Sequence, residues 1–367
     1  MLANFVEDRA RLAELEPQIK VLEQALAALR LKKSAIKERL DAYKYPVLTL
    51  PNEIVAEIFL HFLPKYPICP PLAGPDSPVL LTHICHLWRE IAFATPKLWR
   101  AISLSSVERT PFNPDHIWLS RAGCYETDNY SANIPKLLAA ILPVRARCEY
   151  LQLRLEYHAS ALPTIEGNFP LLRHLDIELD NHTSREIQFL DAPMLRFVVL
   201  DGWAARWVTR LPWTQLTTLW LHLIKFETCV PILQTATSLL DCRLDMTQGN
   251  AEFTSPDPPI VLPCLKSLEA DFDDSTDMDG FLHSFTLPAL SSLTVCGELL
   301  GQDGVLSLRS LIARSGSCNL EHLRITCIAV TPLDENSYRL AFPSVRNIEF
   351  GVDPDPQPLH LLSNWDL

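Results

Sequence analysis

Apolar residues recur in a fixed pattern from Cys148 onward. Each unit is an apolar residue, two variable residues, a second apolar residue, one variable residue and a third apolar residue. Nine units follow one another at intervals of 21 to 30 residues. They are Cys148/Leu151/Leu153, Leu172/Leu175/Ile177, Leu195/Val198/Leu200, Leu216/Leu219/Leu221, Leu239/Cys242/Leu244, Leu265/Leu268/Ala270, Leu290/Leu293/Val295, Leu320/Leu323/Ile325 and Val345/Ile348/Phe350. Because the last two apolar positions alternate with a polar one, each unit predicts a strand with one buried face.

A strand of this kind needs a return segment, and each unit buries its apolar side only by stacking on its neighbours. Pro often stands two residues before the first position, as Pro170, Pro193 and Pro288 do. Two return segments, Val230 to Leu239 and Val305 to Ala313, have helical spacing. This is the pattern of leucine-rich repeats, although the Asn usual at their turn is missing. We therefore expect an α/β leucine-rich-repeat solenoid with a parallel sheet.

Residues 5 to 43 carry a heptad of apolar residues, which predicts a long, coiled-coil-like helix at the N-terminus. One core position holds Leu12, Ile19, Leu26 and Leu40, and the other holds Leu15, Leu22, Leu29, Ile36 and Tyr43. Lys33 interrupts the first series. Pro17 falls on the outer face, where it either kinks the helix or marks the start of a second one. A seam this long predicts either a coiled coil or a helix that lies as a stalk on its own chain.

The charges beside this seam favour one orientation if the helix self-associates. An antiparallel pair would set Glu16 beside Lys37 and Glu23 beside Arg30. A parallel pair would bring Lys32 near Lys37. Each exposed ion pair is worth only ~0.5 kcal/mol, so the charges express a weak preference for the antiparallel arrangement.

Residues 46–104 predict two short helices with more apolar surface than they can bury against each other. Pro51 and Glu53 suit the first turn of the first helix. Its apolar residues at four-residue spacing are Ile54, Ile58 and Phe62, and the second helix has Ile84, Leu87, Trp88 and Ile91. Surplus apolar surface of this kind usually belongs to a partner protein.

At these residues the chain resembles the F-box family, in particular the F-box-like proteins of mushroom-forming fungi. The resemblance is carried by Leu-Pro-x-Glu-Ile-x-x-Glu-Ile-Phe at 50–59, Cys-x-x-Trp-Arg at 85–89 and Thr-Pro-x-Leu-Trp-x-x-Ile at 95–102. It covers about sixty residues. One departure is the loop between the helices, because residues 64–78 contain six prolines.

The resemblance implies a substrate-recognition subunit of an SCF-type ubiquitin ligase. Its small helical F-box would dock a Skp-type adaptor and, through the adaptor, a cullin, while the repeats bind a protein substrate. The expected adaptor contacts are Leu50, Pro51, Glu53, Ile54, Ile58, Phe59 and Trp88. The alternative is a ligase-independent interaction scaffold, in which these side chains form the core of the helical pair and bind no adaptor.

The substrate is expected on the concave face of the sheet, at the residues between the buried positions. These residues are Arg154, Asp176, Glu178, Trp220, His222, Arg243, Asp245, Glu269, Arg324, Thr326 and Glu349. Of these, the expected substrate contacts are Arg154, Asp176, Trp220, His222, Arg243 and Arg324. Trp and Arg are enriched at binding hot spots, although an ordinary surface position on a sheet is the plainer interpretation for each residue.

The 367 residues thus divide into five predicted parts: the heptad helix 1–45, the F-box 46–104, a helical connector 105–147, the repeats 148–352 and a tail 353–367.

The net charge of −12 argues against nucleic-acid binding. No apolar run approaches the ~20 residues that span a bilayer, so we expect no membrane association. The ten cysteines form no Cys-x-x-Cys, and several stand at apolar repeat positions. Reduced thiols and a cytoplasmic or nuclear location are expected.

No cofactor, metal site or catalytic residue is expected. The His and Cys residues at 83–86 lack a second cluster that would complete a zinc site. The acidic run at 271–279 places Ser275 and Thr286 where a calcium loop requires Asp and Glu. No nucleophile elbow, metalloprotease helix or Gly-rich phosphate loop occurs. An F-box subunit would act by raising the local concentration of substrate, which needs no covalent chemistry.

Overall fold

A computed structural model describes residues 2–42, 46–65, 68–70, 75–105, 145–155, 166–179, 187–247, 254–273, 278–316, 318–326 and 335–351. The chain divides into two compact units, Met1–Glu57 and Ile58–Leu367. This division falls inside α2 (Asn52–Phe62) and coincides with none of the four boundaries between the five predicted parts, which stay predictions. Residues 106–144 of the expected helical connector and the tail 353–367 lie outside the described residues.

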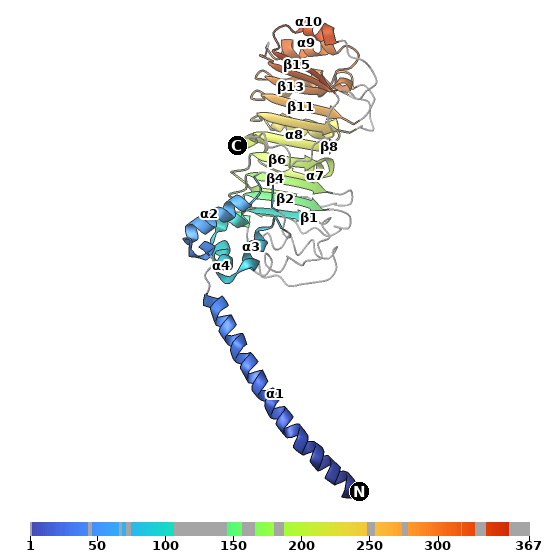
Figure 1. Cartoon of the computed structure of the whole chain (residues 1–367). Helices are drawn as coiled ribbons and strands as arrows, with labels where there is room; N and C mark the ends of the chain where they lie inside the picture. Colours follow the sequence, from blue (N-terminus) through green and yellow to red (C-terminus); the bar gives the residue numbers. More distant parts are fainter. Residues whose placement is uncertain are drawn as a thin grey trace. The chain divides into compact units, whose positions relative to one another are not determined.

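The first unit is dominated by α1, which runs from Leu2 to Ala42 as one helix of 41 residues (Figure 1). The long N-terminal helix is therefore confirmed. Pro17 lies inside α1 and does not begin a second helix. The unit continues with the 3-10 helix η1 (Pro46–Thr49) and the first residues of α2 (Asn52–Phe62).

The second unit begins with the remainder of α2 and two further helices, α3 (Pro78–Ile84) and α4 (His86–Ala94), followed by η2 (Pro96–Trp99). The sequence predicted one helix where α3 and α4 stand. Cys85 separates them because its extended backbone interrupts the helix and its Sγ accepts a hydrogen bond from the Trp88 backbone N–H at 3.5 Å. Ser77 caps α3 in the same way, accepting from the Val79 N–H at 3.2 Å.

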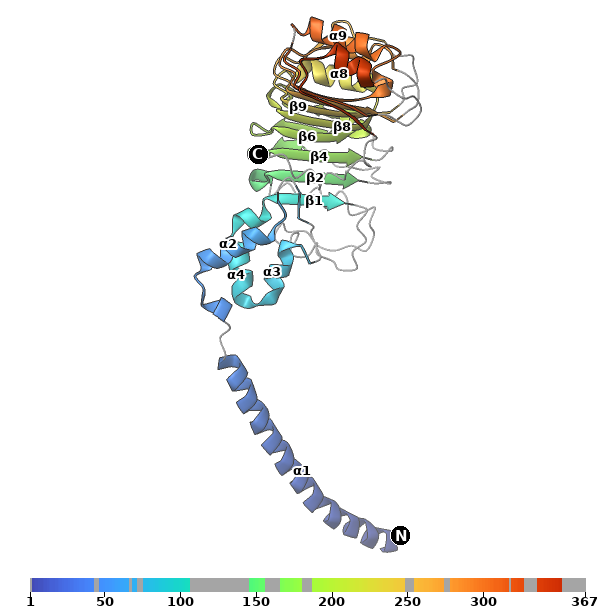
Figure 2. The same ribbon diagram turned by 45° about the horizontal axis from the view of Figure 1, so that its top comes forward.

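A parallel sheet of ten strands runs through the described part of this unit. In order across the sheet, the strands are β1 (Ala101–Ser105), β2 (Tyr150–Leu155), β4 (His174–Leu179), β6 (Phe197–Asp201), β8 (Thr218–Ile224), β9 (Asp241–Met246), β11 (Ser267–Phe272), β13 (Ser292–Cys296), β14 (His322–Thr326) and β15 (Asn347–Gly351). Figures 1 and 2 show them stacked in chain order. The α/β class and the parallel sheet are confirmed.

The nine repeat units lie on nine neighbouring strands, and equivalent positions of successive units pair in register. Leu151, Leu175, Val198, Leu219, Cys242, Leu268, Leu293, Leu323 and Ile348 form one row of partners across nine strands, and the third position of each unit forms a second row. Both rows belong to a continuous apolar core, with only Ile348 and Phe350 of the last unit half-buried. The sheet starts one strand earlier than predicted, because β1 comes from the segment assigned to the F-box.

The prolines before the units have a structural role. In Phe169-Pro170-Leu171-Leu172 the Leu172 N–H donates to the Phe169 carbonyl at 3.1 Å, which closes a turn with Pro at its second position. The turns that begin at Ala192, Leu262, Leu287 and Phe342 close in the same way. The first residue of each turn is buried, so it adds an apolar position to the unit.

Short elements complete the layer behind the sheet. The helices are α7 (Gly202–Trp207), α8 (Phe226–Thr235), α9 (Gly304–Arg314) and α10 (Glu335–Ala341). Small parallel sheets join β3 (Glu166–Asn168), β5 (Ile187–Asp191) and β7 (Val208–Arg210), and β10 (Ile260–Val261) with β12 (Phe285–Thr286). The 3-10 helices are η3 (Arg145–Arg147), η4 (Trp213–Gln215), η5 (Phe281–Ser284) and η6 (Gly297–Leu299). The predicted return helix at 305–313 matches α9, whereas α8 begins and ends earlier than the helical spacing at 230–239 indicated.

None of the described helices combines the length and apolar character that a membrane span requires.

Candidate functional site

One exposed apolar face lies on α2. Ile54 and Ile58, one helical turn apart, are 50% and 46% exposed. Leu50, just before the helix, is 37% exposed, and Pro51 and Glu53 are exposed as well. Large aliphatic side chains in a protein core are almost inaccessible to water. Two half-exposed Ile side chains at i and i+4 therefore form an apolar stripe that faces outward.

Two of the expected adaptor contacts have a different position. Phe59 is 1% exposed, and its ring meets the Trp88 ring edge-on with 5.0 Å between centroids. Phe59 is therefore a core residue, which corrects the expectation that it lies on the exposed face. Trp88 is half-buried, and its indole Nε1 is buried without a hydrogen-bond partner among the described residues. Helical spacing alone did not separate the buried side of α2 from its exposed side, since both carry apolar residues.

The second candidate surface is the polar face of the ten-stranded sheet. Strand register places Gln152, Asp176, Val199, Trp220, Arg243, Glu269, Thr294, Arg324 and Glu349 in one row across this face. Four of the six expected substrate contacts stand in this row. Arg154 and His222 are each two residues further along their strands.

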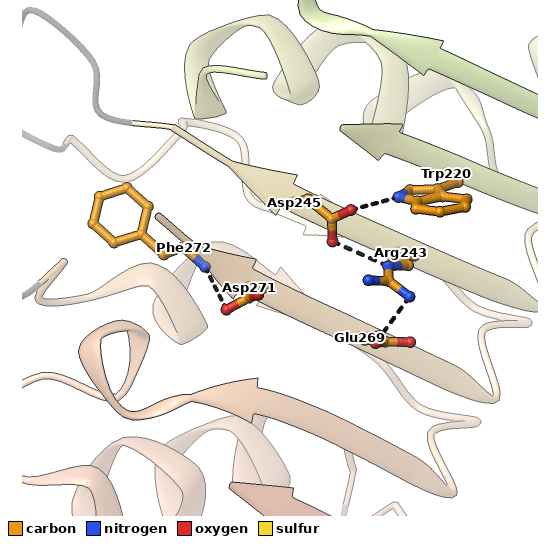
Figure 3. A network of polar contacts seen from close by, with 6 residues as sticks. All are labelled: Trp220, Arg243, Asp245, Glu269, Asp271 and Phe272. Atoms are coloured by element: carbon orange, nitrogen blue, oxygen red, sulfur yellow. Dashed lines mark hydrogen bonds and ion pairs between the residues drawn. The ribbon is translucent and has the colours of Figure 1, made fainter. Parts of the chain in front are cut away.

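The middle of the row is a polar network, shown in Figure 3. The Trp220 indole N–H donates to Asp245 Oδ2 at 2.7 Å, and Arg243 Nε donates to Asp245 Oδ1 at 3.0 Å. The Arg243 guanidinium also lies 3.3 Å from the Glu269 carboxylate and 4.6 Å from the Trp220 ring centroid. His222 adds a ring 6.0 Å from Trp220. Contacts on all sides hold the Arg243 side chain in one orientation.

Exposure within this network is uneven. Trp220 is only 9% exposed and the Arg243 side chain 15%, whereas the Glu269 side chain is 35% exposed. The expectation of an open Trp220 is therefore corrected: its ring lies under the Arg243 guanidinium, and the accessible atoms belong more to the carboxylates. Asp271, which pairs with Asp245 in register, lies on the neighbouring strand, and its carboxylate accepts a hydrogen bond from the Phe272 backbone N–H at 2.9 Å.

One expected contact near the start of the row is buried. Asp176 is 3% exposed and accepts a hydrogen bond from Gln152 Nε2 at 2.7 Å, while Ser103 Oγ donates to Gln152 Oε1 at 2.8 Å. Burial raises the pKa of Asp176, against the opposing effects of Gln152 and Arg154. Asp176 is thus a buried polar residue, which corrects its expected exposure.

The proline-rich loop holds the half-buried Cys69. Burial raises the pKa of its thiol, Asp176 and Cys148 raise it further, and Arg154 lowers it. Arg154 remains on the polar face with its Nε 3.5 Å from Glu178. Sequence reasoning treated residues 64–78 only as a longer connection. Ile68 and Cys69 within this stretch are both half-buried, which an interpretation as a plain connection did not predict.

The structure does not gather all the expected contacts in one place. Trp220, His222 and Arg243 lie together on β8 and β9, whereas Arg324 stands on β14, three strands beyond Arg243. Asp245 and Glu269, which complete the network, were expected only as exposed sheet residues. No cluster of three His, Cys, Asp or Glu side chains with the spacing of a metal site occurs among the described residues.

No protein-family model matches the chain, and comparisons with curated proteins and with solved structures also found no match.

Proposed function

We propose that the chain is the substrate-recognition subunit of an SCF-type ubiquitin ligase. Residues 46–104 act as an F-box that docks a Skp-type adaptor, which in turn binds a cullin. The parallel sheet with its stacked return segments is a leucine-rich-repeat solenoid that binds a protein substrate. The F-box resemblance implies that the subunit itself needs no catalytic residue, because it acts by holding the substrate close to the ubiquitin-transfer machinery.

The single observation that carries this proposal is the apolar face of α2. It falls in the Leu-Pro-x-Glu-Ile-x-x-Glu-Ile-Phe stretch that resembles the F-box family, and Ile54 and Ile58 are half-exposed there. Pairs of large aliphatic side chains left open on one helix are typical of a helix that contacts a partner. Phe59, on the other side of the helix, fixes α2 to its neighbours instead.

The polar face of the sheet supports the substrate-binding half of the proposal. In its central network the carboxylates of Asp245 and Glu269 contact Arg243, and Asp271 pairs with Asp245 in register. These carboxylates outnumber Arg243, the only basic residue of β9 and β11, which favours a substrate segment that carries Lys or Arg side chains. The network is held rigid before binding, which lowers the entropic cost of association.

Co-purification tests the adaptor contact. The double variant Ile54→Glu, Ile58→Glu places two charges on the exposed face without removing a core side chain, and Glu is well tolerated in helices. We expect the wild-type chain to retain a Skp-type adaptor on affinity purification and the double variant to lose it. The matched control is Leu306→Glu, Leu340→Glu, which charges two exposed leucines on α9 and α10. The control is expected to retain the adaptor.

The alternative is a ligase-independent scaffold, and the same experiment distinguishes it. A scaffold predicts that neither the wild-type chain nor the control retains a Skp-type adaptor, although both still capture other proteins. Retention of the adaptor by the Ile54→Glu, Ile58→Glu variant would mean that the α2 face is not the docking surface.

A further inference from the structure

The longest exposed apolar surface of the described chain is the seam of α1. Its eight apolar heptad residues from Leu12 to Leu40 are between 48% and 69% exposed. These residues are Leu12, Leu15, Ile19, Leu22, Leu26, Leu29, Ile36 and Leu40. They follow the 3.5-residue repeat of a two-stranded coiled coil, in which a second helix covers such a seam. The proposed F-box function gives this helix no role.

We infer that the seam of α1 binds the seam of a second copy of this chain, so that two chains form an antiparallel coiled coil. The occupant is identified by the charges that flank the seam. The residue directly after the second core position of each heptad is charged. It is acidic in the first half of the helix, at Glu16 and Glu23, and basic in the second half, at Arg30 and Lys37. A helix with this reversal of sign is complementary to its own copy when the copy runs in the opposite direction.

The register follows from these charges. Glu16 lies beside Lys37 of the second copy and Glu23 beside Arg30, and the two-fold axis repeats both pairs. Antiparallel core layers that satisfy this register pair Leu26 with Leu29, Ile19 with Ile36 and Leu15 with Leu40 of the second copy. The same register sets Arg9 against Lys44 of the second copy, which lies outside the described residues.

Lys33 distinguishes this arrangement from a parallel one. In the antiparallel register Lys33 lies opposite Leu22 of the second copy, and its long side chain can extend to water. In a parallel pair the two Lys33 side chains would share one core layer, and Lys32 would lie beside Lys37. The parallel pair gains only Arg11 beside Glu16 in return. The antiparallel pair therefore combines more attraction with less repulsion.

Mass measurement of the full chain in solution tests the association. A single chain has a mass of 41.5 kDa, so the dimer is expected at twice that mass, about 83 kDa. The variant Leu26→Asp, Leu29→Asp charges the central core layer and is expected to give the single-chain mass. The matched control is Leu31→Asp, which changes a leucine of the same helix that is 73% exposed but lies on the outer face. The control is expected to keep the dimer mass.

A second variant tests the orientation. Arg30→Glu, Lys37→Glu makes all four flanking positions acidic in the antiparallel dimer, so the dissociation constant is expected to rise about tenfold or more at low salt. In a parallel dimer the same change would place a carboxylate beside Lys32 and strengthen association. Mixing this variant with Glu16→Lys, Glu23→Lys is expected to restore association between the two complementary chains.

Three results would overturn the inference. The first is a single-chain mass for the wild-type protein at about 100 µM. The second is equal loss of the dimer in Leu31→Asp and in Leu26→Asp, Leu29→Asp, and the third is tighter association of Arg30→Glu, Lys37→Glu. None of these readouts depends on adaptor binding, so failure of this inference and failure of the proposed function are separate outcomes.

Discussion

His174 shows how the polar face can bury a titratable side chain. Its ring is buried and stacks on Phe197 with 4.3 Å between centroids and 19° between planes. Its Nδ1 has no hydrogen-bond partner among the described residues. Burial lowers the pKa of His174 to about 3, from 6.5. An alternating sequence pattern places His174 on the polar face but does not reveal that this part of the face is covered.

This pKa predicts how stability depends on pH. Between pH 6.5 and about 3 the unfolded chain carries a proton on His174 that the folded chain does not. The free energy of unfolding should therefore fall as the pH is lowered below 6.5, by up to about 1.4 kcal/mol per pH unit from this residue. His174→Phe keeps a flat ring on Phe197 and removes the titration. Urea unfolding at pH 7 and pH 5 should show a smaller loss for the variant than for the wild type; equal losses would contradict the assignment.

At the scale of elements, the sequence predicted strands more accurately than helices. Strand positions are fixed by two apolar residues that alternate with a polar one, and the paired rows from Leu151 to Ile348 follow the repeat without a shift. Helix ends depend on single residues instead. Cys85 ends one helix and caps the next, and no apolar period records such a break. Burial of Asp176 and Trp220 was also beyond the pattern, because an alternating pattern does not record what covers a strand, such as the Arg243 side chain that lies over Trp220.

The start of α7 gives a prediction at this scale. A Cβ added at Gly202 would lie 2.4 Å from the Leu223 carbonyl oxygen and 3.2 Å from the Ile224 Cα, and both are backbone atoms of β8. Since β8 pairs with β6 up to His222 and again with β9 at Ile224, these backbone atoms have little room to move, and Gly202→Ala should lower the free energy of unfolding by about 1–3 kcal/mol. Gly351→Ala is the control, because no atom lies within 4 Å of its added Cβ. Denaturant titration should show a change within about 0.5 kcal/mol for the control, and similar losses in both variants would contradict the close approach.

At the scale of the whole molecule, the two compact units differ in what holds them together. The sheet unit has a continuous apolar core of its own. Helix α1 has 41 residues and an exposed seam, and isolated helices are only marginally stable in water. If a second copy covers the seam, the stability of α1 depends on protein concentration by mass action, whereas the stability of the sheet unit does not.

The chain carries its own probes for this difference. All eight tryptophans, the first of which is Trp88, lie outside α1, so tryptophan fluorescence reports only on the rest of the chain. Circular dichroism at 222 nm reports on α1 as well. We expect a helical melting transition that moves to higher temperature between about 1 and 100 µM protein, while the fluorescence transition stays in place. In Leu26→Asp, Leu29→Asp the concentration dependence should disappear with the fluorescence transition unchanged. A fluorescence midpoint that shifts with concentration together with the helical signal would show instead that association involves the sheet unit.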